Sequence, residues 1–281
     1  MKTNKTMKRN FFVINLKGEK EPFSFRKVFL SARNVGASKE VAFEIARQIE
    51  KEAFPGISTS QIFDRIFELL LEKSPHSAIR FNLKRAMEKL GPTGYPFEKF
   101  IGKVFESEGF KVETNAFVPG ASGVKYEIDF LAQKGKLVYI GECKFRHERG
   151  GRVDLQVALA NYARFLDIKE GRFFDSCLKY KSILATNAKF TNQVIKYSNY
   201  VGVDLLGWKY PRGEGLEKLI EKNQLYPITI LPSVSHGLAK VLIDQKIVLV
   251  KDVFLRGFER IKISRKQKIQ KEAEILWGMR Q

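Results

Sequence analysis

The chain has 281 residues, of which 44% are hydrophobic, and 50 lysines and arginines against 31 aspartates and glutamates give a formal net charge of +19. The apolar content excludes a disordered chain, and the length suggests two domains with an appended segment. No apolar run approaches the ~18 residues of a membrane-spanning helix, and the run at 11–14 is too short for a signal peptide. We therefore expect a cytoplasmic protein that is not associated with a membrane.

The cysteine and histidine content argues against a zinc protein. The two cysteines cannot build a disulfide framework, there is no CxxC pair, and the three histidines are scattered. A reducing compartment fits this composition. The positive charge is spread along the whole chain, which favours a polyanion such as nucleic acid over a mere basic tail. A solubilising lysine surface is the alternative.

Residues 11–90 are predicted to form a small α-rich unit headed by a hairpin. The apolar residues 11–14 form its first strand, and Lys17-Gly18-Glu19 forms a tight turn. The following helices are marked by a start at Ser24, an N-cap at Ser38, a capping box of Ser58 with Gln61, and the apolar positions Ile79, Leu83 and Met87.

The segment 91–96 contains two prolines and two glycines, which cannot continue a helix and mark a domain boundary. After it the sequence predicts a helix at 97–105, extended segments at 110–118, 126–133 and 137–145, a helix with Leu155, Leu159, Tyr162 and Leu166, a strand at 182–186, a helix near 194 and a strand at 203–208. This order indicates an α/β fold around one sheet.

We therefore divide the chain into residues 1–92, 93–210 and 211–281. The last part is predicted to be a helical extension, with short helices at 216–222 and 238–243. Its basic end, 260–271, is expected to dock on the core with a solvated basic face rather than to lie on nucleic acid.

Acidic residues interrupt two of the predicted strands. Because side chains alternate along a strand, Glu127 and Asp129 are expected on one face, and Ile128 and Phe130 on the other. Isolated carboxylates do not belong in apolar strands without a reason.

The next strand places Glu142 and Lys144 on one face by the same alternation. If the two strands pair, Asp129 meets these two side chains, and the two carboxylates can bind Mg²⁺ through oxygen. Lys144 would orient a water molecule or stabilise phosphate charge beside the metal. An ion pair on an exposed sheet face would give the same pattern.

The arrangement D-x(12)-E-x-K, preceded by a helix with Phe97-Glu98-Lys99-Phe100, resembles the PD-(D/E)xK nuclease superfamily. The similarity covers about residues 95–210 and is closest to Mrr-like restriction endonucleases and archaeal-type Holliday junction resolvases. It implies a restriction-endonuclease-like αβββαβ core with a mixed central sheet. It also implies a Mg²⁺- or Mn²⁺-dependent DNA endonuclease that leaves a 5′-phosphate and a 3′-hydroxyl, and a homodimer.

The resemblance also implies roles for individual residues. Asp129 and Glu142 would bind metal with the Cys143 carbonyl, Lys144 would be the motif lysine, and Glu98 and Gln156 would be further catalytic residues. Without the resemblance, Glu98 is an ordinary acid near a helix dipole and Gln156 a helix surface residue.

Two features of the strand before the site depart from the superfamily pattern. Ile128 stands where proline is usual, and Glu127 adds an acid that either binds a second metal or is solvated. The loop after the motif carries Arg146, Arg149 and Arg152, which could grip a DNA backbone or simply be solvated.

The first domain resembles an ATP-cone. The matching segments are Val13-Ile14, Gly18, Pro22-Phe23, Lys27, Gly56-Ile57-Ser58-Thr59 and Asn82-Leu83-Lys84-Arg85-Ala86. The resemblance implies ATP or dATP as an effector, with Lys17 and Lys27 as nucleotide-binding residues. The usual Lys-Arg pair of the first hairpin is replaced by Asn15 and Leu16, so a structural or DNA-facing remnant is the alternative.

The sequence thus favours a Mg²⁺-dependent DNA endonuclease regulated by a nucleotide. One alternative is a catalytically inactive nucleic-acid-binding protein on a nuclease scaffold. The other is a nucleotide-responsive DNA-binding regulator, which the absence of a cysteine quartet makes the weaker of the two.

Overall fold

The computed structural model describes residues 11–91, 93–147, 150–171, 175–255 and 258–277. The chain divides into two compact units, one built on residues up to Lys84 together with those from Glu274 onward, and one from Arg85 to Ala273. Within the described residues, no helix is both long enough and apolar enough to cross a membrane.

The first unit is a two-stranded hairpin followed by helices. Its elements are β1 (Phe12–Ile14), β2 (Lys20–Pro22), α1 (Phe25–Arg33), α2 (Lys39–Glu52), α3 (Thr59–Lys73) and the start of α4 (Pro75–Glu88). The predicted caps are confirmed. The Ser24 and Ser38 hydroxyls accept backbone N–H bonds, and Ser58 with Gln61 forms the complete capping box.

The second unit contains a mixed sheet. Its main elements are α5 (Tyr95–Ser107), β3 (Lys111–Pro119), β4 (Lys125–Lys134), β5 (Leu137–Lys144), α6 (Leu155–Glu170), β7 (Lys179–Thr186), α7 (Asn192–Val201) and β9 (Asp204–Leu206). Among the described residues, the sheet has the order β3-β4-β5-β7-β9, with antiparallel pairs up to β5 and parallel pairs after it. The predicted α/β sheet is confirmed, and β6 (Arg152–Val153) and β8 (Lys189–Phe190) form a short separate parallel pair.

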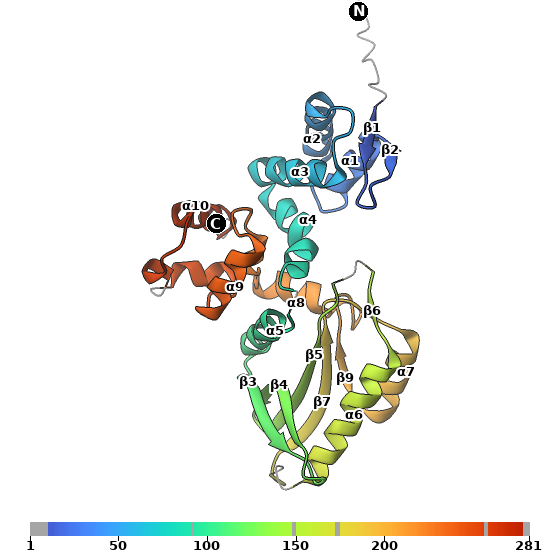
Figure 1. Cartoon of the computed structure of the whole chain (residues 1–281), viewed down its shortest axis with the longest axis vertical. Helices are drawn as coiled ribbons and strands as arrows, with labels where there is room; N and C mark the ends of the chain where they lie inside the picture. The colour runs from blue at the N-terminus through green and yellow to red at the C-terminus, as the bar shows by residue number, and fades with distance from the viewer. Residues whose placement is uncertain (1–10, 92, 148–149, 172–174, 256–257, 278–281) are drawn as a thin grey trace, which may run out of the picture. The chain divides into compact units, whose positions relative to one another are not determined.

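Helices α5 and α6 cover opposite faces of this sheet, and Figure 1 shows α6 running along one of them. Phe105 of α5 lies 5.8 Å from Tyr139, measured between ring centroids, whereas Ile140 packs with Phe165 and Ile168 of α6. Because consecutive residues of β5 point to opposite faces, these contacts assign one face to each helix.

The buried face of α6 does not follow the spacing of its large apolar residues. The apolar spacing pointed to Leu155, Leu159, Tyr162 and Leu166, but Ala158, Asn161, Phe165 and Ile168 are buried, and Leu159 and Leu166 are exposed. Asn161 belongs to the buried face because its side-chain amide donates to Ser182 of β7, at 2.9 Å. The buried face of α6 therefore includes a polar residue whose hydrogen bond is satisfied inside the core, and apolar spacing alone does not identify such a face.

The C-terminal part of the second unit is helical, as expected. It contains α8 (Leu216–Asn223), η1 (Ile228–Ile230), α9 (His236–Asp244), η2 (Val250–Phe254), η3 (Phe258–Arg260) and the larger part of α10 (Lys266–Trp277). The end of the basic segment lies in α10, and one side of that helix is buried. Ile269 and Ala273 are fully buried, and the buried carboxylate of Glu272 accepts hydrogen bonds from the Ser233 hydroxyl and N–H, at 2.6 and 3.0 Å.

Candidate active site

The strand pairing becomes irregular at Asp129. On one side, β3–β4 pairing joins Thr114 to Phe130 and Ala116 to Ile128, but Asn115 and Asp129 lie between these pairs without being matched. On the other side, β4–β5 pairing begins only at Phe130 with Gly141. The backbone of Asp129 therefore lies outside the regular ladders of both neighbouring strands.

This irregularity overturns the predicted alternation of β4. Ile128 packs with Ile168 of α6, whereas the Phe130 ring lies 4.9 Å from the Phe105 ring of α5. The two apolar side chains are on opposite faces of the sheet, not on the same one. The physical reason is the distortion opposite Asp129, where Asn115 has a φ of 61° that extended strands do not adopt.

The Asp129 carboxylate replaces the missing ladder bond. Its Oδ2 accepts a hydrogen bond from the Cys143 backbone N–H, at 2.6 Å, which fixes it beside the end of β5. Burial raises the pKa of Asp129 to about 7, the negative charge of Glu142 adds to this rise, and the hydrogen bond from Cys143 opposes it. A positive charge placed beside such a carboxyl would stabilise its ionised form.

Glu142 lies on the α6 face of β5. Its Oε2 accepts a 2.6 Å hydrogen bond from Nη1 of Arg164, with side-chain exposures of 18% and 26%. One residue earlier, Gly141 leaves no room for a side chain. A Cβ there would come within 2.2 Å of the Phe130 ring.

Lys144 is half-buried at the end of β5, on the face that the alternation shares with Glu142. Its carbonyl accepts a 2.6 Å hydrogen bond from the Thr186 hydroxyl of β7, which anchors this strand end. The Cys143 thiol between the two residues is buried, and that burial raises its pKa, so it is not a reactive thiolate.

Glu98 comes to this region from the first turn of α5. The side chain is half-buried and folds back over the helix start, where a Cβ on Gly94 would lie 2.8 Å from its Oε1. Burial raises the pKa of Glu98, and the charges of Glu127 and Glu142 raise it further. The charges of Glu142 and Glu98 act on Asp129, and the charge of Glu142 acts on Glu98, so these three residues form an acidic cluster. The charge of exposed Glu127 also acts on Glu98.

Gln156 is not brought into this cluster. It is exposed in the first turn of α6 and has no hydrogen bond to the cluster among the described residues. Because each residue advances ~100° around a helix, Gln156 lies on the side opposite the buried residues Ala158 and Phe165.

The arginine loop is only partly described. The Arg146 backbone N–H donates to Asn187 Oδ1 and its carbonyl accepts from Asn187 Nδ2, both at 2.8 Å, and its guanidinium lies 3.4 Å from Asp154. Arg152 is exposed on β6. Arg149 lies outside the described residues.

The two lysines predicted to bind a nucleotide differ in their surroundings. Lys27 lines a cavity of about 280 Å³ in the first unit, and its Nζ lies 3.1 Å from Glu21. Lys17 is exposed in the hairpin turn. Asn15, where the cone family has a cation, instead organises the hairpin by donating to Glu19 and Glu21, both at 2.9 Å.

Sequence reasoning missed two functional candidates, Arg164 and Asn115. The spacing of the large apolar residues of α6 gives no sign that Arg164 faces the sheet. Asn115 carried a weak signal, since asparagine is among the residues that tolerate a positive φ.

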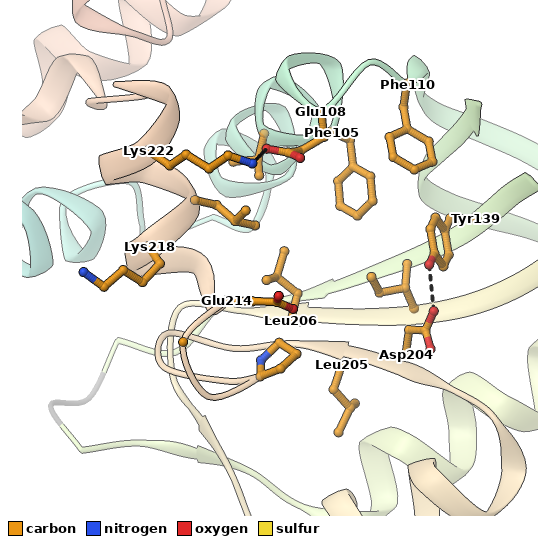
Figure 2. Close-up of a pocket in the computed structure, with 15 residues that line it drawn as sticks. Phe105, Glu108, Phe110, Tyr139, Asp204, Leu205, Leu206, Glu214, Lys218 and Lys222 are labelled. Atoms are coloured by element: carbon orange, nitrogen blue, oxygen red, sulfur yellow. Dashed lines mark hydrogen bonds and ion pairs between the residues drawn. The ribbon is translucent and has the colours of Figure 1, made fainter. Parts of the chain in front are cut away.

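Sequence reasoning also missed a larger cavity on the α5 face of the sheet. This cavity has a volume of about 640 Å³, and Figure 2 shows Phe105, Phe110 and Tyr139 on one side of it. The Tyr139 hydroxyl donates to Asp204 at 2.7 Å, and burial together with this bond raises its pKa. The aromatic wall is thus held in place by a charged partner.

The donor chemistry of the cluster fits a hard cation. Among the described residues, no three His, Cys, Asp or Glu side chains are arranged to hold a metal ion together. Mg²⁺, however, usually takes one or two carboxylates and fills its remaining positions with other oxygens. Asp129, Glu142 and the Cys143 carbonyl are oxygen donors of that kind, at a point where negative charge is in excess.

The fold and site define an α/β protein with a mixed, helix-flanked sheet and an acidic cluster at the point where β4 and β5 cease to pair. An uncharacterized protein of Archaeoglobus fulgidus is 36% identical to this chain over 162 residues, which cover 58% of this chain and 88% of that protein. The chain belongs to the AF1548-like family, whose C-terminal family model matches residues 226–277.

Two solved structures are similar to the chain. The crystal structure of AF1548, a protein of unknown function, has a TM-score of 0.57 and 32% identity, and the match covers 66% of this chain and 100% of that one. MspJI restriction endonuclease in complex with a 27-mer oligonucleotide has a TM-score of 0.32 and 14% identity, covering 74% of this chain and 48% of that one. The second likeness is too low to carry an argument.

Proposed function

We propose that this protein is a metal-dependent endonuclease that hydrolyses phosphodiester bonds in DNA. The observation that carries the proposal is the carboxylate of Asp129, which leaves the regular strand ladder to bind the Cys143 N–H beside Glu142. A distorted strand that presents a buried acid next to a second acid is costly, and such strain is found at functional sites.

Asp129 and Glu142 would hold Mg²⁺ or Mn²⁺ together with the Cys143 carbonyl. The cation would supply a Lewis acid that polarises the phosphate and acidifies bound water. Lys144, on the same face as Glu142, would orient the attacking water or stabilise charge on the phosphate. Glu98 would assist from α5, while Gln156 belongs to the proposal through the family resemblance alone.

The positive charge of the chain supports DNA as the partner. A formal net charge of +19 favours binding to a phosphate backbone. Arg146, Arg149 and Arg152 are proposed as backbone contacts that position the strand, because arginine pairs well with phosphate. A homodimer that cuts both strands is part of the proposal by resemblance.

Cleavage of supercoiled plasmid in Mg²⁺ or Mn²⁺ tests the function. The parent should cut, D129A and K144A should lose at least ~100-fold in rate as groups of the reaction centre do, and E113Q on the exposed side of β3 should cut like the parent. A panel of methylated, branched and plain DNA and RNA would identify the substrate. Retention of DNA without cutting would instead favour the inactive binding protein.

We also propose that the first unit binds ATP or dATP as an effector. The observation that favours it is the cavity of about 280 Å³ in the first unit, which Lys27 lines and Lys17 does not. Direct binding of labelled dATP to the whole chain, weakened by K27A, tests this second proposal. Nucleotide-dependent assembly without metal-dependent cleavage would favour the regulator.

A further inference from the structure

Arg164 forms a partly buried ion pair with the acidic cluster. Its Nη1 donates to Glu142 Oε2 at 2.6 Å, and both side chains are mostly withdrawn from solvent. The contact uses one carboxylate oxygen, whereas bidentate pairing is the stronger geometry for arginine and a carboxylate. The guanidinium is therefore close to Glu142 but does not bind both of its carboxylate oxygens.

The guanidinium compensates a cluster that is otherwise rich in negative charge. Asp129 is affected by the charges of Glu142 and Glu98, and among its neighbours Arg164 acts in the opposite direction. Leaving such carboxylates in a half-buried site without a counter-charge is costly. Arg164 thus supplies from α6 the positive charge that a bound cation would otherwise bring.

We propose that Arg164 is the resident counter-ion of the metal-free site, and that its positive charge opposes the binding of a divalent cation to Glu142. This inference rests on the proposed function, because it assigns Glu142 to the metal. The chemical class of the competing ligand is a hard divalent cation held by oxygen, such as Mn²⁺ or Mg²⁺.

The distances indicate that Arg164 and a divalent cation would compete for the Glu142 carboxylate. With the guanidinium 2.6 Å from Oε2, a cation on the same carboxylate would lie within about 5 Å of a positive charge, where repulsion is strong at a site withdrawn from water. Removing the guanidinium should therefore strengthen metal binding. If Arg164 instead only oriented Glu142 for the metal, its removal would weaken binding.

Calorimetric titration of the whole chain with Mn²⁺ tests the inference. R164Q should bind Mn²⁺ about tenfold or more tightly than the parent, and R164K, which keeps the charge, should stay close to the parent. K181Q is the control, because it also removes the cation of an ion pair, the 2.7 Å pair of Lys181 with Asp204, outside the proposed site. K181Q should leave the affinity for Mn²⁺ unchanged.

The outcomes separate this inference from the function on which it rests. Tighter binding by R164Q with a parent-like R164K supports the counter-ion. Weaker or unchanged Mn²⁺ binding by a folded R164Q overturns the inference while leaving the metal site intact. If R164Q does not fold, R164K decides, because it keeps the charge: tighter Mn²⁺ binding by R164K than by the parent would overturn the inference. If neither the parent nor any variant binds Mn²⁺, the metal site and the inference fall together.

Discussion

At the scale of single residues, the pKa of Asp129 predicts how the metal-free protein responds to pH. An unfolded aspartate ionises near 3.8, whereas the folded carboxyl holds its proton up to about 7. The unfolded state therefore releases this proton first as the pH rises, so folding stability is lost between these two values. Below them the penalty is absent, and above them it is complete.

The variant D129N removes this penalty, because its side-chain oxygen can still accept from the Cys143 N–H. In EDTA, D129N should gain about 2–3 kcal/mol more stability relative to the parent at pH 8 than at pH 5. Denaturant unfolding at the two pH values measures the difference. An equal effect of D129N at both values would mean that Asp129 is not a buried acid of raised pKa.

At the scale of elements, Asn115 sets the distortion of the β3–β4 pair. Its φ of 61° coincides with the point at which β4 changes the face of its side chains, directly opposite Asp129. A β-branched residue rarely adopts this conformation, whereas glycine does so freely. N115V should therefore cost about 1–3 kcal/mol of stability, while N115G should be nearly neutral.

The same pair of variants links the distortion to the site. N115V should also weaken Mn²⁺ binding, because a regular strand would withdraw the Asp129 carboxylate from the Cys143 N–H. Thermal unfolding and Mn²⁺ titration of N115V and N115G measure the two effects. A stable N115V that binds Mn²⁺ like the parent would separate the strand distortion from the site.

Sequence periodicity predicted the elements better than their faces. Local signals such as the Ser58–Gln61 capping box act within one turn, so they placed helix starts correctly. The reversal at Asp129 depends on a partner strand, and the buried Asn161 depends on Ser182 of β7. Neither is visible in local periodicity, which is why Glu142 was found while Arg164, its partner on α6, was missed.

At the scale of the whole molecule, the chain joins an α-rich unit to an α/β unit that carries the acidic cluster. The proposed effector site in the first unit differs from the cone family in its charges, since Asn15 replaces a cation and Glu21 lies 3.1 Å from Lys27. A carboxylate beside the remaining lysine opposes the binding of a triphosphate. The balance between these two side chains should therefore set nucleotide affinity.

Because Lys27 and Glu21 carry opposite charges, we expect substitutions of these two residues to change dATP binding in opposite directions. Saturating dATP should raise the melting temperature of the whole chain, because a ligand that binds the folded state stabilises it. K27A should reduce this shift, and E21Q, which removes the competing carboxylate, should enlarge it. K39A, on the exposed first turn of α2, serves as the charge-matched control and should behave like the parent. Equal shifts in all four proteins would exclude the cavity at Lys27 as the nucleotide site, and the first unit would then serve the structure or the DNA rather than an effector.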